Sequence, residues 1–159
     1  MSDIPPIRIG LGHDTHQLAS GGPMILGGVQ INCDWHLVGH SDADVLLHAI
    51  TDAVLGAAGL GDIGTLFPNT ADENANRCSR EMLSLAYTKV RNAGWKITNI
   101  DCVIFATQPK ISPFRDSMIQ SIQETMNLET GQVFLKGKTG ENVGPVGRSE
   151  AIMAECIVL

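Results

Sequence analysis

Two short segments carry residue types that commonly bind metal ions. Asp14 and His16 are two positions apart in GHDTH, so in an extended segment their side chains point to the same side. His48 lies within the apolar stretch VLLHAITDAVLGAAG, which is typical of a buried helix. A carboxylate and two imidazoles are all zinc ligands, and three protein ligands with an open fourth position characterise a catalytic zinc site. The three residues are therefore a candidate catalytic metal site.

Each of these residues also has a structural interpretation. Asp14 and His16 could be the polar end of a strand, and a lone histidine in an apolar helix is more often a core residue held by a hydrogen bond. Asp52 follows His48 by four positions on the same helix face, where it could bond the far nitrogen of His48 or remain an exposed carboxylate. The combination of three possible ligands favours the metal site.

His40 and Ser41 directly precede this helix in HSDADVLLH. The spacing of Ser41 and Asp44 resembles a capping box and predicts that the helix begins at Ser41. A helix N-terminus offers free N–H groups and a positive dipole end to anions. His40 and Ser41 are therefore candidate phosphate contacts, with simple capping by Ser41 as the alternative.

The strands and helices that must position these residues alternate along the chain. The sequence predicts a loose tail at 1–6, strands at 7–12, 96–106, 133–138 and 151–159, a hairpin at 24–26 and 29–31, a loop at 60–76, and helices from 41 to a glycine at 59 or 61, at 79–93 and at 112–127. This order favours an α/β (α+β) fold, with helices packed on one face of a mixed β-sheet, in one domain spanning 1–159. The other sheet face then needs a cover, which another subunit could provide.

The bulk composition excludes several classes of protein. The chain has 159 residues, of which 43% are hydrophobic, so it can form a core without a structural metal or disulfide. The net charge of −6 and the lack of a Lys/Arg block argue against nucleic-acid binding. The four cysteines are far apart and form no CxxC, which predicts reduced thiols and a cytoplasmic location. No segment has the length and apolarity of a signal peptide or membrane span, so we expect no membrane partner.

Four segments, in this order, resemble a known family: GHDTHQL, GHSDADVLLHAITDAVLGAAGLGDIGTLFPNT, ATQPK and GRSEA. They are similar to the 2-C-methyl-D-erythritol 2,4-cyclodiphosphate synthases of the non-mevalonate isoprenoid pathway, and the resemblance extends from Arg8 to the last strand. It implies a phosphorus–oxygen lyase that converts 4-diphosphocytidyl-2-C-methyl-D-erythritol 2-phosphate to the cyclodiphosphate and releases CMP. It also implies a homotrimer with active sites between subunits.

The resemblance implies roles for particular residues. Asp14, His16 and His48 would hold Zn²⁺ or a similar divalent ion, and Glu141 would hold a second ion, Mg²⁺ or Mn²⁺, together with the substrate. His40 and Thr139 match positions that stabilise the transition state. The implied substrate contacts are Ser41, Asp62, Ile63, Gly64, Phe67, Ala106, Pro109, Lys110, Lys138 and Arg148. Within this set, Lys110 and Lys138 could instead face solvent, and Arg148 could lie at the trimer centre.

The sequence departs from the family pattern in three places. The positions concerned are Asn69 and Ala71, where acids are usual, Lys138 and Gly140, where hydroxyl residues are usual, and Pro145, where an aromatic is frequent. The metal ligands are intact, so these departures bear on nucleotide contacts and not on the reaction class. Two rival hypotheses stay open. The first is a zinc-dependent phosphate or nucleotide hydrolase, which would need a general base, although the sequence has no HExxH motif. The second is a non-catalytic metal-assembled trimer or ligand-binding module.

Overall fold

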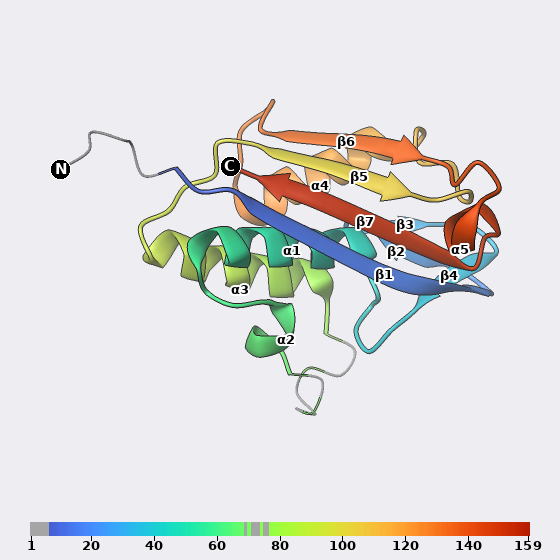
Figure 1. Cartoon of the computed structure of the whole chain (residues 1–159), viewed down its shortest axis with the longest axis horizontal. Coiled ribbons are helices and arrows are strands. Elements are labelled where there is room, and N and C mark those ends of the chain that lie inside the picture. Colours follow the sequence, from blue (N-terminus) through green and yellow to red (C-terminus); the bar gives the residue numbers. More distant parts are fainter. Residues whose placement is uncertain (1–6, 69, 71–73, 75–76) are drawn as a thin grey trace.

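A mixed β-sheet forms the centre of the fold (Figure 1). The structure is a computed structural model that describes residues 7–68, 70, 74 and 77–159. Within these residues the sheet has five strands in the order β4 (Trp35–Val38), β1 (Gly10–Ser20), β7 (Ala151–Val158), β5 (Ile100–Phe105) and β6 (Val133–Lys138). The β5–β6 pair is parallel and the other pairs are antiparallel. The predicted hairpin is confirmed as β2 (Met24–Leu26) paired with β3 (Val29–Ile31).

Three longer helices form a layer on one face of this sheet (Figure 1). They are α1 (Val45–Ala58), α3 (Ser79–Asn92) and α4 (Arg115–Met126), and the short helices α2 (Ile63–Leu66) and α5 (Gly144–Gly147) lie in connections. The predicted mixed sheet with helices on one face is therefore confirmed. No helix in the described part of the chain is long and apolar enough to cross a bilayer.

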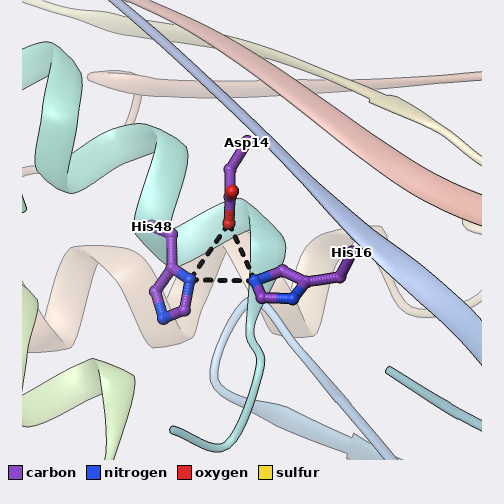
Figure 2. Close-up of side chains that lie close together, drawn as sticks. All are labelled: Asp14, His16 and His48. Carbon is purple, nitrogen blue, oxygen red and sulfur yellow. Dashed lines mark hydrogen bonds and ion pairs between the residues drawn. The ribbon is translucent and has the colours of Figure 1, made fainter. Parts of the chain in front are cut away.

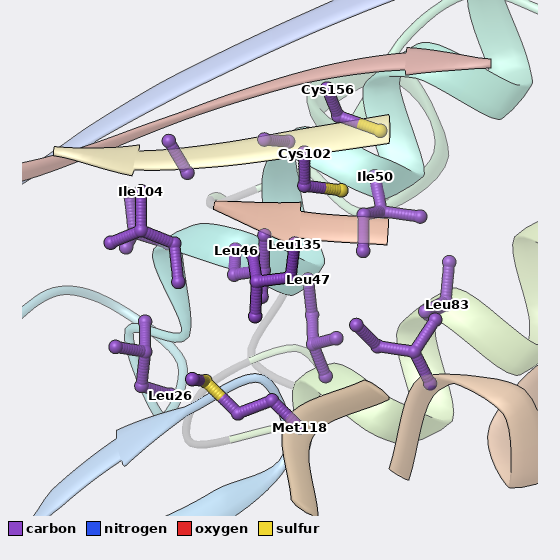
Figure 3. Close-up of a cluster of buried hydrophobic side chains, with 14 of the residues drawn as sticks. Leu26, Leu46, Leu47, Ile50, Leu83, Cys102, Ile104, Met118, Leu135 and Cys156 are labelled. Atoms are coloured by element: carbon purple, nitrogen blue, oxygen red, sulfur yellow. The ribbon is translucent and has the colours of Figure 1, made fainter. Parts of the chain in front are cut away.

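The hydrophobic core lies between the inner face of the sheet and the three helices (Figure 3). Its fully buried side chains come from both layers, and include Leu46, Leu47 and Ile50 of α1, Leu83 of α3, Met118 of α4, and Ile104 of β5. Burying each such side chain contributes roughly 1.5–3 kcal/mol, so this contact fixes α1 against the sheet.

The first strand is longer than the predicted 7–12. It runs from Gly10 to Ser20 because it pairs with β7 and then with β4, so Asp14 and His16 lie inside the strand and not after it. Gly12 faces α1 so closely that a Cβ atom there would lie 1.8 Å from the carbonyl oxygen of Ala49. This close approach brings the next residues on the same face of β1 within reach of α1.

The helix that carries His48 begins later than predicted. Asp44, and not Ser41, is its N-cap, and Asp44 Oδ1 accepts the Leu47 N–H at 3.1 Å. The two oxygens of Asp44 also accept the N–H groups of Gly27 and Gly28 at 2.9 and 2.6 Å. The buried carboxylate serves helix and hairpin together, which explains why it takes the cap position.

Other boundaries differ by a few residues. The predicted helix end at Gly59 is confirmed, since this residue caps α1 with a φ of 71°. The strand predicted at 96–106 is only Ile100–Phe105, and the helix predicted from 112 begins at Arg115. The predicted loop at 60–76 contains α2. The predicted tail at 1–6, part of this loop, and the departures at Asn69 and Ala71 lie outside the described residues.

Candidate metal centre and active site

Asp14, His16 and His48 converge on one point between β1 and α1 (Figure 2). Asp14 Oδ2 lies 3.0 Å from both His16 Nε2 and His48 Nδ1, and these two nitrogens are 3.2 Å apart. The side chains are only 12–28% exposed. The three residues that were predicted to form a metal site therefore lie together in the structure, although they are up to 34 positions apart in the sequence.

The arrangement of lone pairs suits a metal ion. His16 Nδ1 lies 2.8 Å from the carbonyl oxygen of Val38, which can only accept, so Nδ1 carries a proton and, in the neutral ring, the lone pair of Nε2 is available to a metal ion. Ligand atoms around a tetrahedral ion at roughly 2.0–2.1 Å are about 3.3 Å apart, close to the separations found here. One carboxylate and two imidazoles thus form a set that could hold a divalent metal.

Electrostatics in the cluster favour an ionised carboxylate. Partial burial acts to raise the pKa of Asp14, but the hydrogen bonds and charges of His16 and His48 outweigh it and hold that pKa well below its usual value. For His16, burial acts to lower the pKa, and the hydrogen bond and charge of Asp14 reverse this, so its pKa is raised. The carboxylate stays negative and attracts a cation to the centre.

The metal centre opens into a cavity of about 210 Å³. Five of the predicted site residues line it together with the three ligands, namely His40, Ser41, Ile63, Gly64 and Phe67. Asp62 stands beside this cavity as the N-cap of α2, where its Oδ1 accepts the Thr65 N–H at 2.7 Å. The stretch around α2 therefore supplies part of the lining of this cavity.

A second cavity, of about 230 Å³, holds another group of the predicted residues. Ala106, Lys110, Lys138 and Thr139 line it, with Arg115 as a further cation, and none of them lines the first cavity. The structure thus divides the predicted site between two places on one chain.

Four predicted residues are not among the lining residues of either cavity: Asp62, which stands beside the first cavity, and Pro109, Glu141 and Arg148. Glu141 Oε1 accepts the Thr139 hydroxyl at 3.0 Å, so it lies next to a residue of the second cavity. Arg148 is exposed and pairs with Glu150 at 2.8 Å.

Two alternatives were left open for Asp52, and two contacts of the centre were not predicted. Asp52 does not bond His48; its Oδ1 accepts the Ile63 N–H at 2.7 Å and ties α2 to α1. The far nitrogen of His48 instead faces Ser79 Oγ at 2.8 Å, and Ser79 bonds Asp42. Nothing in the spacing of Asp42 and Ser79, 37 residues apart, marks them as neighbours.

The fold and the cluster define a class: an α/β protein whose candidate metal centre lies between a sheet strand and its covering helix. The model of the YgbB family matches residues 7–159, and the chain belongs to this family.

Relatives of known type share nearly the whole chain. It is 53% identical over 152 residues to the 2-C-methyl-D-erythritol 2,4-cyclodiphosphate synthase of Chromobacterium violaceum, covering 96% of each chain. A solved synthase structure in a CDP-bound form is 36% identical with a TM-score of 0.88, over 96% of this chain and 99% of that one. The bifunctional IspDF of Campylobacter jejuni is 42% identical with a TM-score of 0.91, over 95% of this chain and 41% of that larger one.

Proposed function

We propose that the chain is a 2-C-methyl-D-erythritol 2,4-cyclodiphosphate synthase, a phosphorus–oxygen lyase of isoprenoid precursor biosynthesis. Its substrate is 4-diphosphocytidyl-2-C-methyl-D-erythritol 2-phosphate. An oxygen of the 2-phosphate attacks the diphosphate phosphorus nearer the erythritol, the bond from that phosphorus to the CMP oxygen breaks, and an eight-membered ring closes. The observation that carries the proposal is the intact Asp14–His16–His48 centre in a chain that belongs to the YgbB family.

The metal identity is part of the proposal. Asp14, His16 and His48 would hold Zn²⁺ or a similar divalent ion, a choice supported by their one-carboxylate, two-imidazole donor set. Glu141 would hold Mg²⁺ or Mn²⁺ with the substrate, since its carboxylate is a hard oxygen ligand. Such ions supply Lewis-acid neutralisation of charge on the phosphates when bound.

The protein need not supply a nucleophile, because the attacking phosphate belongs to the substrate. The task of the chain is to fold a flexible polyanion so that its two phosphate groups meet, and to offset the developing charge. His40 and Ser41 line the metal cavity and would contact a phosphate there. Lys138 and Lys110 line the second cavity with Thr139 and would bring positive charge to the diphosphate.

We further propose that the protein is a homotrimer whose active site combines the metal cavity of one subunit with the second cavity of another. Two features support this proposal. Predicted residues occupy two separate cavities of a single chain. In addition, the outer face of the sheet carries Leu11, Phe134 and Ile157, which are 52–68% exposed.

We also propose a cytoplasmic location. The four cysteines are free thiols, and reducing compartments keep thiols in this state.

A product assay tests the reaction. Incubation with the substrate and Mg²⁺, followed by ³¹P NMR, is expected to yield the cyclic diphosphate and CMP in equal amounts, and EDTA is expected to abolish turnover. Release of inorganic phosphate, or of a linear product with CMP, would favour the hydrolase instead. Absence of turnover in a protein that retains its metal would favour the non-catalytic trimer.

A further inference from the structure

Next to the metal centre, and not among the lining residues of its cavity, lies a pair of polar residues that the proposed reaction does not use. We infer that Asp42 and Ser79, called here the Asp42–Ser79 pair, fix the ring of His48 so that Nδ1 presents its lone pair to the metal. They are positioning residues, and the inference rests on the proposed metal centre.

Ser79 forms hydrogen bonds through both its hydroxyl group and its backbone N–H. Its side chain is fully buried at the first residue of α3, and its Oγ lies 2.8 Å from His48 Nε2. The same hydroxyl donates to Asp42 Oδ1, while the Ser79 N–H donates to Asp42 Oδ2 at 3.0 Å. Asp42 therefore holds both the backbone and the side chain of Ser79.

The direction of these hydrogen bonds determines the state of the imidazole. An ionised carboxylate can only accept, so the single hydroxyl proton of Ser79 points to Asp42. Ser79 Oγ then offers only lone pairs to His48, and Nε2 must carry a proton that it donates. Nδ1 lies 3.0 Å from Asp14 Oδ2 (Figure 2), and when a divalent ion takes the place of the proton between these two atoms, the neutral ring that is protonated on Nε2 presents the lone pair of Nδ1 to that ion.

Ser41 also lies next to Nε2 of His48, but it has a different role. Its Oγ lies 3.1 Å from His48 Nε2 and accepts the Ala43 N–H at 3.2 Å. Ser41 lines the metal cavity, so a substrate phosphate can engage it. Ser79 does not line this cavity and keeps its contact with His48 whether or not the site is occupied.

Partners of this kind normally raise the affinity of a histidine for its metal, and their loss lowers it by about 10–100-fold. We therefore expect Ser79→Ala to weaken Zn²⁺ binding at least about 10-fold. Asp42→Asn should act in the same direction, since an amide cannot accept from both the N–H and the hydroxyl of Ser79 through its two terminal atoms.

Metal affinity is measured by competition between metal-stripped protein and a chromophoric Zn²⁺ chelator, with no substrate present. Ser121→Ala is the matched control, because Ser121 is also a buried serine in the helical layer, and its Oγ has no hydrogen-bond partner among the described residues. The control should bind Zn²⁺ like the wild type. Wild-type affinity in folded Ser79→Ala protein would overturn the inference.

A measurement on the unmutated protein covers the case in which the variants do not fold. In ¹H–¹⁵N spectra of the Zn²⁺-loaded wild type, the Nε2 proton of His48 should be visible and slow to exchange with solvent. A fast-exchanging proton would overturn the inference. Because neither readout requires turnover, a failed product assay with an intact effect of Ser79→Ala would reject the proposed reaction and leave the Asp42–Ser79 pair in place.

Discussion

The two histidines of the metal centre are oriented through their outer nitrogens by different parts of the fold. His16 is held by a backbone carbonyl at the end of β4, through its bond to Val38. His48 is held by a side chain at the start of α3. Residue type makes these side chains possible ligands, but the outer partners decide which nitrogen is available to a metal ion.

Replacement of His48 by alanine should separate metal binding from folding. We expect His48→Ala to lose Zn²⁺ affinity by more than about 100-fold, since a ligand is removed outright. The free energy of unfolding should fall by only about 1–2 kcal/mol, because the large core does not depend on this side chain. Elemental analysis and urea unfolding measure the two effects.

The control for this change is His36→Ala, which removes a histidine of β4 that bonds the carbonyl oxygen of Gly21 outside the centre. It should retain full Zn²⁺ content. Full Zn²⁺ content in His48→Ala would contradict the assignment of the ligand, and complete unfolding would mean that the metal is structural.

Asp52 offers a test based on pH. Burial raises its pKa, and the charges of Asp62 and Asp14 add to this against the opposing hydrogen bond from Ile63. A carboxyl group whose pKa is higher in the folded than in the unfolded state stabilises the fold at low pH and loses this contribution as pH rises through the folded pKa. Asp52→Asn, which keeps an acceptor for Ile63, should therefore be more stable than the wild type at pH 7.

The gain should be less than about 1 kcal/mol, since solvent screens this half-exposed group. It should shrink toward pH 4, where the wild-type carboxyl takes up its proton. Urea unfolding at the two pH values, with EDTA to remove metal linkage, measures it. A larger gain in stability at pH 4 than at pH 7 would show that the predicted direction of the pH dependence is wrong.

At the scale of elements, the contact between β1 and α1 builds the centre. Gly12 permits this contact, and an added methyl group would meet the backbone of Ala49. We expect Gly12→Ala to lower the free energy of unfolding by about 2–4 kcal/mol and to reduce Zn²⁺ content, since Asp14 is two residues away. Gly56→Ala is the control: it lies in α1 with no atom near the added Cβ, and should stabilise by about 0.5–1 kcal/mol. Equal stability of the two variants would contradict the proposed packing.

The sequence predicts much of this layer because its signals are local. The two-residue spacing of Asp14 and His16 predicted that both side chains point to one side of an extended segment, and the apolar stretch around His48 indicated a buried helix. Boundaries were less accurate where distant groups compete. Asp44 displaced Ser41 as N-cap because it also serves Gly27 and Gly28 of the hairpin, a contact that no spacing encodes.

Contacts that depend on packing between helices could not be predicted. Asp52 has the helical spacing expected of a partner for His48, but α2 folds back and Ile63 takes its carboxylate. Ser79 is the hydrogen-bond partner of His48 instead, because the start of α3 lies beside the start of α1. The division of the other predicted site residues between two cavities likewise follows from the fold.

At the scale of the whole molecule, the outer face of the sheet has a row of three apolar residues, interrupted by Asp101, across several strands. Leu11 pairs with Ile157, Ile157 with Asp101, and Asp101 with Phe134, so these residues share one row. Lys136 bonds Asp101 at 2.5 Å and covers part of its charge. Such a face is suited to association with further copies of the chain, as the proposed homotrimer requires.

Ile157→Glu should therefore convert a trimer to a monomer in light scattering, because it places a charge in the buried centre of the proposed interface. Zn²⁺ content should persist, since all three ligands belong to one chain, while turnover should be lost. Leu85→Glu is the matched control, an exposed leucine on α3 in the helical layer that should leave the trimer intact. A monomeric wild type, or a trimeric Ile157→Glu variant, would contradict this arrangement.

Complementation tests whether two subunits share each site. His48→Ala disables the metal half and Thr139→Ala disables the second cavity, so each variant alone should lack turnover. In a trimer assembled at random from equal amounts of both, about one quarter of the interfaces would join an intact metal half to an intact second cavity. The co-expressed mixture should thus recover up to about one quarter of wild-type activity. If each site were built within a single chain, every copy would carry one defect, and the mixture would be as inactive as its components.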